Sequence, residues 1–304
     1  MTALPGQPGM LLVGDAAAPP PAQLLLDQYP GAAAAYSLRL LNSTYTGNCI
    51  EVRRASDNTP QNIGFLGGVV DTALLKNFCA STSCFVRTWY DQTTNAQHGQ
   101  MVVNANQPSI VTNGVILREN GQPAISFTGS DVRLNVPNAV YLYGGTQFFI
   151  AAVVRANNFG GATAPTVFAA YTSAGYKSSL GYAINPVNSS TYDIGGRRNG
   201  SDIFLRATST VNAPQVQRLV IGHNDYSQGK ATLWENGVNT ATNNGFHIGA
   251  MENASNSSAP DNIGGFSFIQ DYNGQIQEIV IYNSNQTSNR TGIENNIRTY
   301  YNTY

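Results

Sequence analysis

The sequence predicts an all-β protein, a sandwich of two antiparallel sheets with a few short helices. From Tyr36 onward, short runs of β-branched and aromatic residues alternate with Gly and Asn turn signals. Two Asn-Gly pairs lie between apolar runs, which is a strong signal for a hairpin. Of the 304 residues, 42% are hydrophobic and only 11% are charged. Many short strands in an uncharged chain rich in Gly and Asn favour a sandwich.

Each expected strand is a short run bounded by turn residues. The runs are Cys49–Arg54, Cys84–Tyr90, Val115–Leu117, Ala124–Phe127, Phe148–Val154, Thr166–Tyr171, Ser179–Ile184, Ile203–Ala207, Arg218–His223, Ala231–Trp234 and Gln275–Tyr282. Asn120-Gly121 and Asn236-Gly237 supply the hairpin turns. Phe148–Val154 is apolar throughout, which indicates a central strand buried on both faces.

Two helices are expected. One spans Asp71–Phe78, after the Gly67-Gly68 turn. The other closes the chain, with Thr287 or Ser288 as its cap and an apolar stripe that includes Ile293 and Ile297. We interpret that stripe as core packing, because helical spacing of apolar residues is what a docked helix needs.

The charge balance excludes several classes of function. Sixteen Lys or Arg against 17 Asp or Glu give a net charge of -1, with no basic stripe for nucleic acid. No apolar run approaches the ~20 residues of a membrane helix, and the N-terminus lacks the pattern of a secretory signal. We expect no nucleic-acid or membrane partner.

The composition changes once along the chain. Residues 1–35 hold six prolines and an Ala run, which predicts an extended arm before a domain at 36–304. Two apolar patches in this arm would anchor it to a partner surface: Met10, Leu11 and Leu12, and then Leu24, Leu25 and Leu26. The alternative is a free N-terminal tail.

Three cysteines bear on redox and metal chemistry. Cys79 and Cys84 close a short loop between the expected helix and a strand, where a disulfide is sterically plausible. Cys49 is interpreted as a buried thiol, since no His lies near it in the sequence. The scattered His residues make a zinc site improbable, so no metal or cofactor is expected.

The front of the domain resembles a known enzyme family. The motifs that carry the resemblance are Tyr36-Ser-Leu-Arg-Leu-Leu, Ile50-Glu-Val-Arg-Arg, Asp71–Phe78, the cysteine pair, and Trp89-Tyr-Asp-Gln-Thr-Thr-Asn95. They resemble the catalytic domain of α-L-arabinofuranosidase B, glycoside hydrolase family 54. The resemblance implies a concanavalin A-like jelly roll and a disulfide between the two cysteines. The C-terminal half resembles laminin-G-like jelly rolls.

The same segment, with its Pro/Ala arm, is also similar to structural proteins of tailed bacteriophages. That similarity implies a non-enzymatic virion protein, a capsid decoration, head fibre or tail component, which docks through its arm. Its partners would be other virion proteins, in a homo-oligomer, and its lectin-like domain would adhere to cell-surface carbohydrate. We adopt this as the main expectation, with localisation in the virion.

The alternatives are an arabinofuranosidase-like hydrolase and a secreted carbohydrate-binding protein. Glycoside hydrolysis needs two carboxyl groups, and the resembling family has a Glu on a mid-domain strand and an Asp just after Ile-Gly-Gly. Here Phe266 follows Ile263-Gly264-Gly265, and Asp193 is the sole carboxylate between residues 180 and 200. Asp193 with Asp261 or Asp271 remains possible as a displaced pair.

Candidate sugar contacts are aromatic and polar residues of the recognised motifs. They are Trp89, Asp91, Gln92, Asn95, Asp193 and Trp234. Either indole could stack on a sugar ring, although for each one taken singly we favour a core position. For Asp91 we favour a structural turn, in which the carboxylate accepts hydrogen bonds from backbone amides.

Overall fold

The computed structural model describes residues 23–129, 131–137, 142–157, 165–172, 175–185, 189–211, 215–252, 260–265 and 271–304. Its first strands are β1 (Ala34–Ser37), β2 (Ile50–Arg54), β3 (Pro60–Ile63), β4 (Phe65–Leu66), β5 (Val69–Val70), β6 (Cys84–Trp89), β7 (Gly99–Gln100), β8 (Ser109–Thr112), β9 (Val115–Ile116), β10 (Arg118–Glu119), β11 (Gln122–Pro123), β12 (Ile125–Thr128) and β13 (Leu134–Val136). The later ones are β14 (Gln147–Ala156), β15 (Thr166–Thr172), β16 (Gly175–Asn185), β17 (Ser189–Gly196), β18 (Leu205–Thr208), β19 (Arg218–Asp225), β20 (Lys230–Glu235), β21 (Val238–Asn243), β22 (Asp261–Ile263) and β23 (Asn273–Tyr282). The helices are α1 (Leu25–Gln28), α2 (Thr72–Phe78), α3 (Arg290–Tyr301) and a 3₁₀ turn, η1 (Asn104–Asn106).

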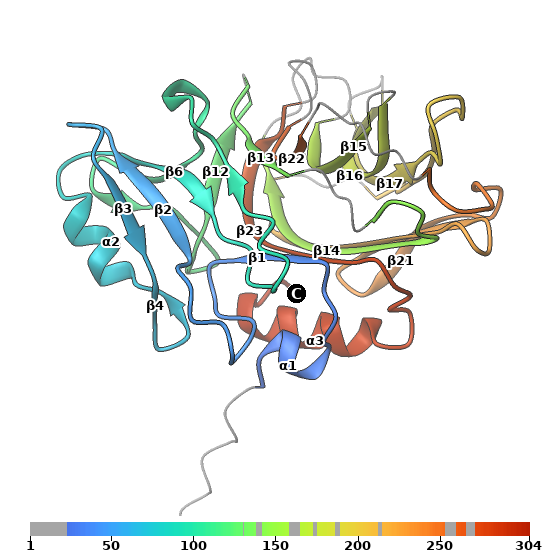
Figure 1. Ribbon diagram of the computed structural model, residues 1–304, viewed down its shortest axis with the longest axis horizontal. Coiled ribbons are helices and arrows are strands. Elements are labelled where there is room, and N and C mark those ends of the chain that lie inside the picture. The colour runs from blue at the N-terminus through green and yellow to red at the C-terminus, as the bar shows by residue number, and fades with distance from the viewer. Residues whose placement is uncertain are drawn as a thin grey trace, which may run out of the picture.

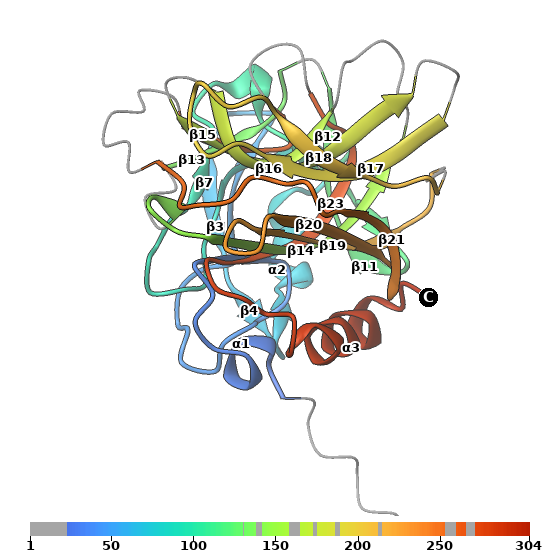
Figure 2. The same ribbon diagram turned by 90° about the vertical axis from the view of Figure 1, so that its right-hand side faces the viewer.

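Most strands belong to one antiparallel sheet that folds over on itself, which confirms the predicted jelly-roll sandwich. We call β12, β1, β23, β14, β19, β20 and β21 the inner half, and β7, β13, β22, β15, β16, β17 and β18 the outer half. Strands β8, β6, β2 and β3 connect them. Figure 2 shows β15 to β18 as a layer above β14, β19, β20 and β21, with α3 beneath.

Strand β14 is buried on both faces, as its unbroken apolar run predicts. Alternate residues such as Phe148 and Ile150 enter the core between the two halves, where Phe148 stacks on Phe168 with ring centroids 6.3 Å apart. The intervening residues, such as Phe149 and Ala151, enter a second core, which lies between the inner half and the helices α1 and α3. The helices therefore form a third layer, visible at the bottom of Figure 1.

The predicted boundary between arm and domain needs correction. Leu25 and Leu26 lie in α1 and are buried in the second core with Ile293 and Ile297 of α3. Strand β1 pairs with β23 along its whole length. The leucines expected to anchor a partner therefore pack in this chain's own domain, and Leu24 is the residue before α1. Met10, Leu11 and Leu12 lie outside the described residues.

The break in the alternation of Gln275–Tyr282 has a structural cause. Val153 pairs with Glu278 and Val154 with Ile276, so Gln277 is bulged out of the ladder between β14 and β23. Its amide nitrogen donates to the carbonyl oxygens of Glu119, Gln122 and Pro123 in the hairpin of β10 and β11. The bulge thus fixes this hairpin to the inner half.

The predicted turns and helices are present, with one shift. Asn120 and Asn236 adopt positive φ angles of 46° and 47°, as Asn-Gly hairpins require. Asp71 caps α2 by accepting a hydrogen bond from the Leu74 amide. Helix α3 begins at Arg290 after Asn289, so neither Thr287 nor Ser288 is its cap. No helix within the described residues is long and apolar enough to cross a bilayer.

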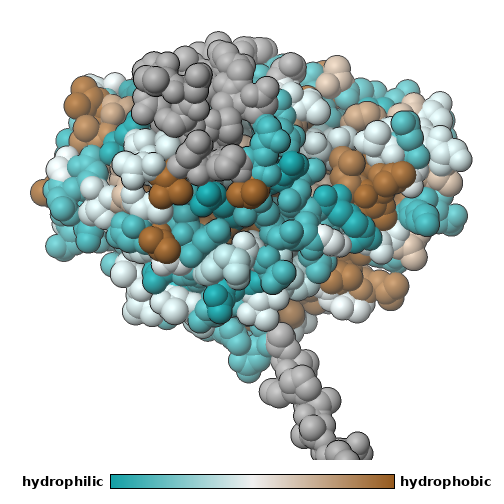
Figure 3. Space-filling view, turned by 180° about the vertical axis from the view of Figure 1, so that it is seen from behind, coloured by the Kyte–Doolittle hydropathy of each residue, from teal (hydrophilic) through white to brown (hydrophobic). Residues whose placement is uncertain are grey.

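The surface is largely polar. Figure 3 shows one face on which apolar side chains form small separate groups among polar ones. Such scattered apolar residues are ordinary for a folded protein.

Candidate functional site

The Tyr-Asp-Gln-Thr motif forms a structural turn. Asp91 is fully buried and accepts hydrogen bonds from the amides of Ala35, Thr93 and Gln97 and from the Thr93 hydroxyl. Gln92 accepts from the Leu41 amide at 2.8 Å. The Asn95 amide donates to the Ala33 carbonyl at 2.8 Å. These side chains hold β1 in place, so the sugar-binding prediction for Asp91 and Gln92 is corrected to a structural role.

The two indoles differ in their surroundings. Trp89 is 0% exposed and contacts Tyr36, with ring centroids 5.9 Å apart, so it cannot stack on a sugar. Trp234 is half-buried and lies under the Arg290 guanidinium, whose carbon is 5.3 Å from the ring centroid. It also lines a pocket of about 440 Å³ together with His223. Trp234 therefore stays a candidate sugar contact.

The cysteine predictions are confirmed. Cys79 and Cys84 form a disulfide that joins the end of α2 to the start of β6. Cys49 is buried, and burial raises the pKa of its thiol well above the usual value. A thiol in that state is unsuited to nucleophilic attack. Among the described residues, no cluster of three or more His, Cys, Asp or Glu could hold a metal ion.

The Ile-Gly-Gly element is built around close approaches. Gly264 has a φ of 84°, and a Cβ added there would lie 2.1 Å from a ring carbon of Phe127. A Cβ added at Gly265 would lie 3.0 Å from Oδ1 of Asp271. The two glycines therefore let Phe127 into the core and let the Asp271 carboxyl lie directly against the backbone. Chain folding thus brings a carboxyl to this element from later in the sequence.

The environment of Asp271 favours its protonated form. The carboxyl is half-buried, and this burial raises its pKa, opposed by the nearby Arg133. Oδ2 accepts a hydrogen bond of 2.7 Å from the Asp131 amide. A half-buried carboxyl with a raised pKa is suited to general-acid chemistry, and Oδ1 of this one is a buried atom without a hydrogen-bond partner among the described residues.

A second carboxylate lies beside Asp271. Asp131 forms an ion pair with Arg133 and accepts a hydrogen bond from the Asn106 side chain. Its φ of 70° is left-handed, which turns the chain as it enters β13. Arg133 therefore serves both carboxyls, because it pairs with Asp131 and acts electrostatically on Asp271. We call Asp131, Arg133 and Asp271 the carboxylate cluster.

Amide side chains continue from the cluster across the outer half. Leu134 and Val136 of β13 enter the core, so the alternate residue Asn135 faces outward. Asn135 pairs with Asn262 on β22 and with Gln100 on β7. Neither Asn135 Oδ1 nor Asn262 Oδ1 has a hydrogen-bond partner within the described part of the chain. Both oxygens are buried atoms, and Asn262 is only 4% exposed, so these amides lie beneath the surface beside the cluster.

The displaced pairs expected from the sequence are not brought together. Asp193 on β17 lies opposite Gly181 on β16, which lies opposite Thr166 on β15, and β15 in turn pairs with β22. Asp193 is therefore three strands away from the Ile-Gly-Gly element. At about 4.8 Å per strand spacing, this is a distance of about 14 Å across the sheet. Hydrolases hold their carboxyls no more than about 9.5 Å apart. Asp193 instead pairs with Arg206 at 2.9 Å.

Asp261 has a structural position. It is 0% exposed and lies opposite Val136, at the edge of the core. Sequence reasoning named Asp271 only as one option and missed Asp131 and Arg133, which carry no motif. The sole signal was the Ile-Gly-Gly element, which marks where a carboxyl must approach.

Sequence comparisons find an arabinofuranosidase family. The family model described as "Alpha-L-arabinofuranosidase B, catalytic" matches residues 26–142. Alpha-L-arabinofuranosidase B of Aspergillus oryzae is 41% identical over 71 residues, which are 23% of this chain and 14% of that protein. The Aspergillus niger protein of the same name is 38% identical over the same share of each chain. The match thus spans a small part of the relatives' length.

Structural comparisons extend the likeness to most of the domain. An arabinofuranosidase complexed with arabinofuranosyl-α-1,2-xylobiose has a TM-score of 0.66 at 18% identity, covering 90% of this chain and 64% of that one. A GH54 α-L-arabinofuranosidase soaked with a cyclic sulfate inhibitor has a TM-score of 0.60 at 17% identity, with the same coverage. The domain is therefore an arabinofuranosidase B-like jelly roll in its fold.

These findings overturn the main functional expectation. The sequence similarity falls on enzymes of the arabinofuranosidase B family, and the fold extends that similarity to most of the domain. The predictions of a phage virion protein, of a capsid decoration or tail fibre, of a virion localisation and of a non-enzymatic role are wrong. Phe266 follows Ile-Gly-Gly in the sequence, so the order of residues alone places no carboxyl directly after this element.

Proposed function

We propose that this chain is a glycoside hydrolase domain that acts on α-L-arabinofuranosides. The observation that carries the proposal is the Asp271 carboxyl, which lies against Gly265 of the Ile-Gly-Gly element with a raised pKa. In the resembling family this element precedes the catalytic acid. The family match and the fold support the substrate class.

The cluster supplies the two roles that glycoside hydrolysis requires. Asp271, which holds its proton more tightly than an ordinary Asp, donates it to the oxygen of the departing group. Asp131 is the second carboxylate, which acts on the anomeric carbon directly or through a water molecule. Arg133 places the two carboxyls in different surroundings, since it forms its ion pair with Asp131 and acts on Asp271 only electrostatically.

Hydrolysis of 4-nitrophenyl α-L-arabinofuranoside tests this assignment. The wild-type chain should release nitrophenol, and Asp271→Asn should lower kcat by about 100-fold or more, because general-acid catalysis contributes that much. A better leaving group, such as 2,4-dinitrophenol, needs less protonation and should restore much of the lost rate. Asp131→Asn should lower kcat for both substrates.

Glu119→Gln is the matched control. Burial also raises the pKa of Glu119, a residue of β10 whose ion-pair partner is Arg155 of β14 and which makes no ion pair with the cluster. This variant should keep wild-type kcat. Loss of activity in Asp193→Asn, together with full activity in Asp271→Asn, would assign the chemistry to Asp193 and refute the cluster.

A further inference from the structure

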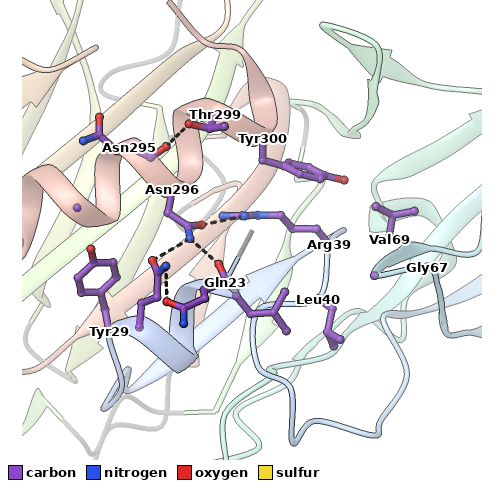
Figure 4. A pocket seen from close by; sticks show the side chains of 14 residues that line it. Gln23, Tyr29, Arg39, Leu40, Gly67, Val69, Asn295, Asn296, Thr299 and Tyr300 are labelled. Atoms are coloured by element: carbon purple, nitrogen blue, oxygen red, sulfur yellow. Dashed lines mark hydrogen bonds between the residues drawn. The ribbon is translucent and has the colours of Figure 1, made fainter. Parts of the chain in front are cut away.

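A pocket of about 690 Å³ lies between α1, α3 and the segments around Arg39 and Gly67–Val69 (Figure 4). Ligand sites in proteins commonly have volumes of about 300 to 1,000 Å³. The pocket belongs to the helical layer beneath the inner half, whereas the carboxylate cluster lies in the segments that lead into β13 and β23, away from the helices (Figure 1). It is therefore separate from the proposed catalytic site.

The pocket wall is electrically neutral. The one charged side chain among its described lining residues is Arg39, which donates from Nε and Nη2 to Glu278 at 2.8 and 2.9 Å. Both partners of this ion pair are buried. No carboxylate lines the described wall. The pocket thus suits an uncharged ligand, and it has no acid to cleave one.

The polar groups of this wall include the Asn295 amide and the Tyr300 hydroxyl, whereas the Tyr29 hydroxyl lies against α3 at Gly292. Asn295 is exposed on α3, and its side chain makes no hydrogen bond to another described residue. An amide presents a donor beside an acceptor, which matches two adjacent hydroxyl groups of a sugar. The rings of Tyr29 and Tyr300 and the aliphatic side chains of Leu24 and Leu40 supply apolar surface for its C–H groups.

The wall is held in shape before any ligand binds. The Asn296 side chain accepts from Arg39 at 3.0 Å and donates to the Gln23 carbonyl at 2.9 Å and to Gln28 Oε1 at 3.2 Å. Figure 4 shows Asn296 between Arg39 and Gln23, so that one residue of α3 ties α1 to the sheet. The Arg39 guanidinium lies 4.9 Å from the centre of the Tyr300 ring and fixes it. Such preorganisation reduces the entropic cost of binding.

We propose that this pocket is a second carbohydrate site, which binds a neutral saccharide unit without cleaving it. Neutral walls, an open amide and aromatic rings are the chemistry that recognises a polyhydroxylated, uncharged ring. If the proposed hydrolase function holds, a polysaccharide bound here keeps its other residues near the cluster at a raised effective concentration. The binding itself does not depend on that function.

Nuclear magnetic resonance of the full chain tests the site directly. The probes are arabinotetraose and xylotetraose, titrated into ¹⁵N-labelled Asp271→Asn protein, which removes hydrolysis. We expect saturable shifts of the Gly67 and Gly68 backbone amides with one of the two probes. Asn295→Trp fills the pocket from an exposed helix position and should abolish these shifts. Asn295→Ala should raise Kd about five- to tenfold, since it removes two hydrogen bonds.

Asn239→Ala is the control, because Asn239 is exposed on β21 and does not line the pocket. It should bind like the parent protein. Unmoved Gly67 and Gly68 amides with both probes, or equal shifts in the Asn295→Trp protein, would overturn the proposal. Hydrolase activity is scored separately on the nitrophenyl substrate, so failure of one proposal is distinguishable from failure of the other.

Discussion

Gly292 tests the contact between α1 and α3, which forms one side of the neutral pocket. In the interior of a helix, Ala is more favourable than Gly by about 1 kcal/mol, so Gly292→Ala should stabilise an isolated α3. In the folded protein, an added Cβ would lie 1.9 Å from the Tyr29 hydroxyl oxygen and 2.6 Å from Cζ. Tyr29 must therefore move.

Tyr29 has little freedom to move without loss. It packs against the second core, and its carbonyl accepts a hydrogen bond from the Tyr282 hydroxyl at 2.7 Å. Displacing a packed aromatic side chain forfeits part of the roughly 1.5 to 3 kcal/mol that its burial supplies, and overpacking adds strain. We expect Gly292→Ala to lower the free energy of unfolding by about 1 to 2 kcal/mol net of the propensity gain.

Urea denaturation of four proteins tests whether Tyr29 causes the loss of stability: wild type, Gly292→Ala, Tyr29→Ala and the double variant. In the Tyr29→Ala background the clash is absent, so Gly292→Ala should raise stability by about 1 kcal/mol. The substitution thus changes sign between the two backgrounds. If Gly292→Ala stabilises the wild-type protein as well, the close approach of Tyr29 to α3 is not present in solution. Asn295→Ala, at an exposed position of α3, controls for propensity alone.

The other predictions concern the disulfide and the proposed acid. Cys79 and Cys84 are 5 residues apart, so replacing both with Ala should lower the free energy of unfolding by about 2 kcal/mol from loop entropy. Adding a reductant should destabilise the wild-type protein by the same amount and should leave the stability of the double-Ala variant unchanged. Burial raises the folded-state pKa of Asp271 above its usual value of 3.8. Its contribution to stability is therefore complete below that value and is lost as pH rises through the folded pKa. Relative to Asp271→Asn, the wild type should lose thermal stability over this window, and an unchanged difference would refute the raised pKa.

Local patterns predicted much of the fold. Phe148–Val154 could be assigned to a doubly buried strand because apolar residues at every position leave no face for solvent. Asn120 and Asn236 could be assigned to hairpin turns because few residues tolerate positive φ. Strands such as β17 and β22 were missed, since Ser, Gly and Asn dominate them and their pairing depends on distant partners.

The candidate site could not be found in the same way. Asp131, Arg133 and Asp271 come from two distant segments and share no sequence spacing. Their contact is made by β22, which pairs with β13 and leads into Gly264 and Gly265. A motif search identifies the residue that follows Ile-Gly-Gly in the sequence, which is Phe266. The carboxyl that lies against this element in space belongs to Asp271, and only the fold determines that.

A raised pKa does not by itself identify a catalytic acid. Burial raises the pKa of both Glu119 and Asp271, and an arginine opposes the shift in each case. Glu119, however, lies in a surface hairpin with Arg155 as its ion-pair partner. Asp271 has a second carboxylate beside it, and that carboxylate, not Asp271, forms the ion pair with Arg133. An arginine that pairs with one carboxyl and acts only electrostatically on the other gives the two carboxyls different environments, as two different roles in catalysis require, whereas a structural ion pair has a single carboxyl. Comparing the activities of Glu119→Gln and Asp271→Asn therefore tests whether catalysis requires the arrangement of Asp271, Asp131 and Arg133, because a raised pKa is common to both substituted carboxyls.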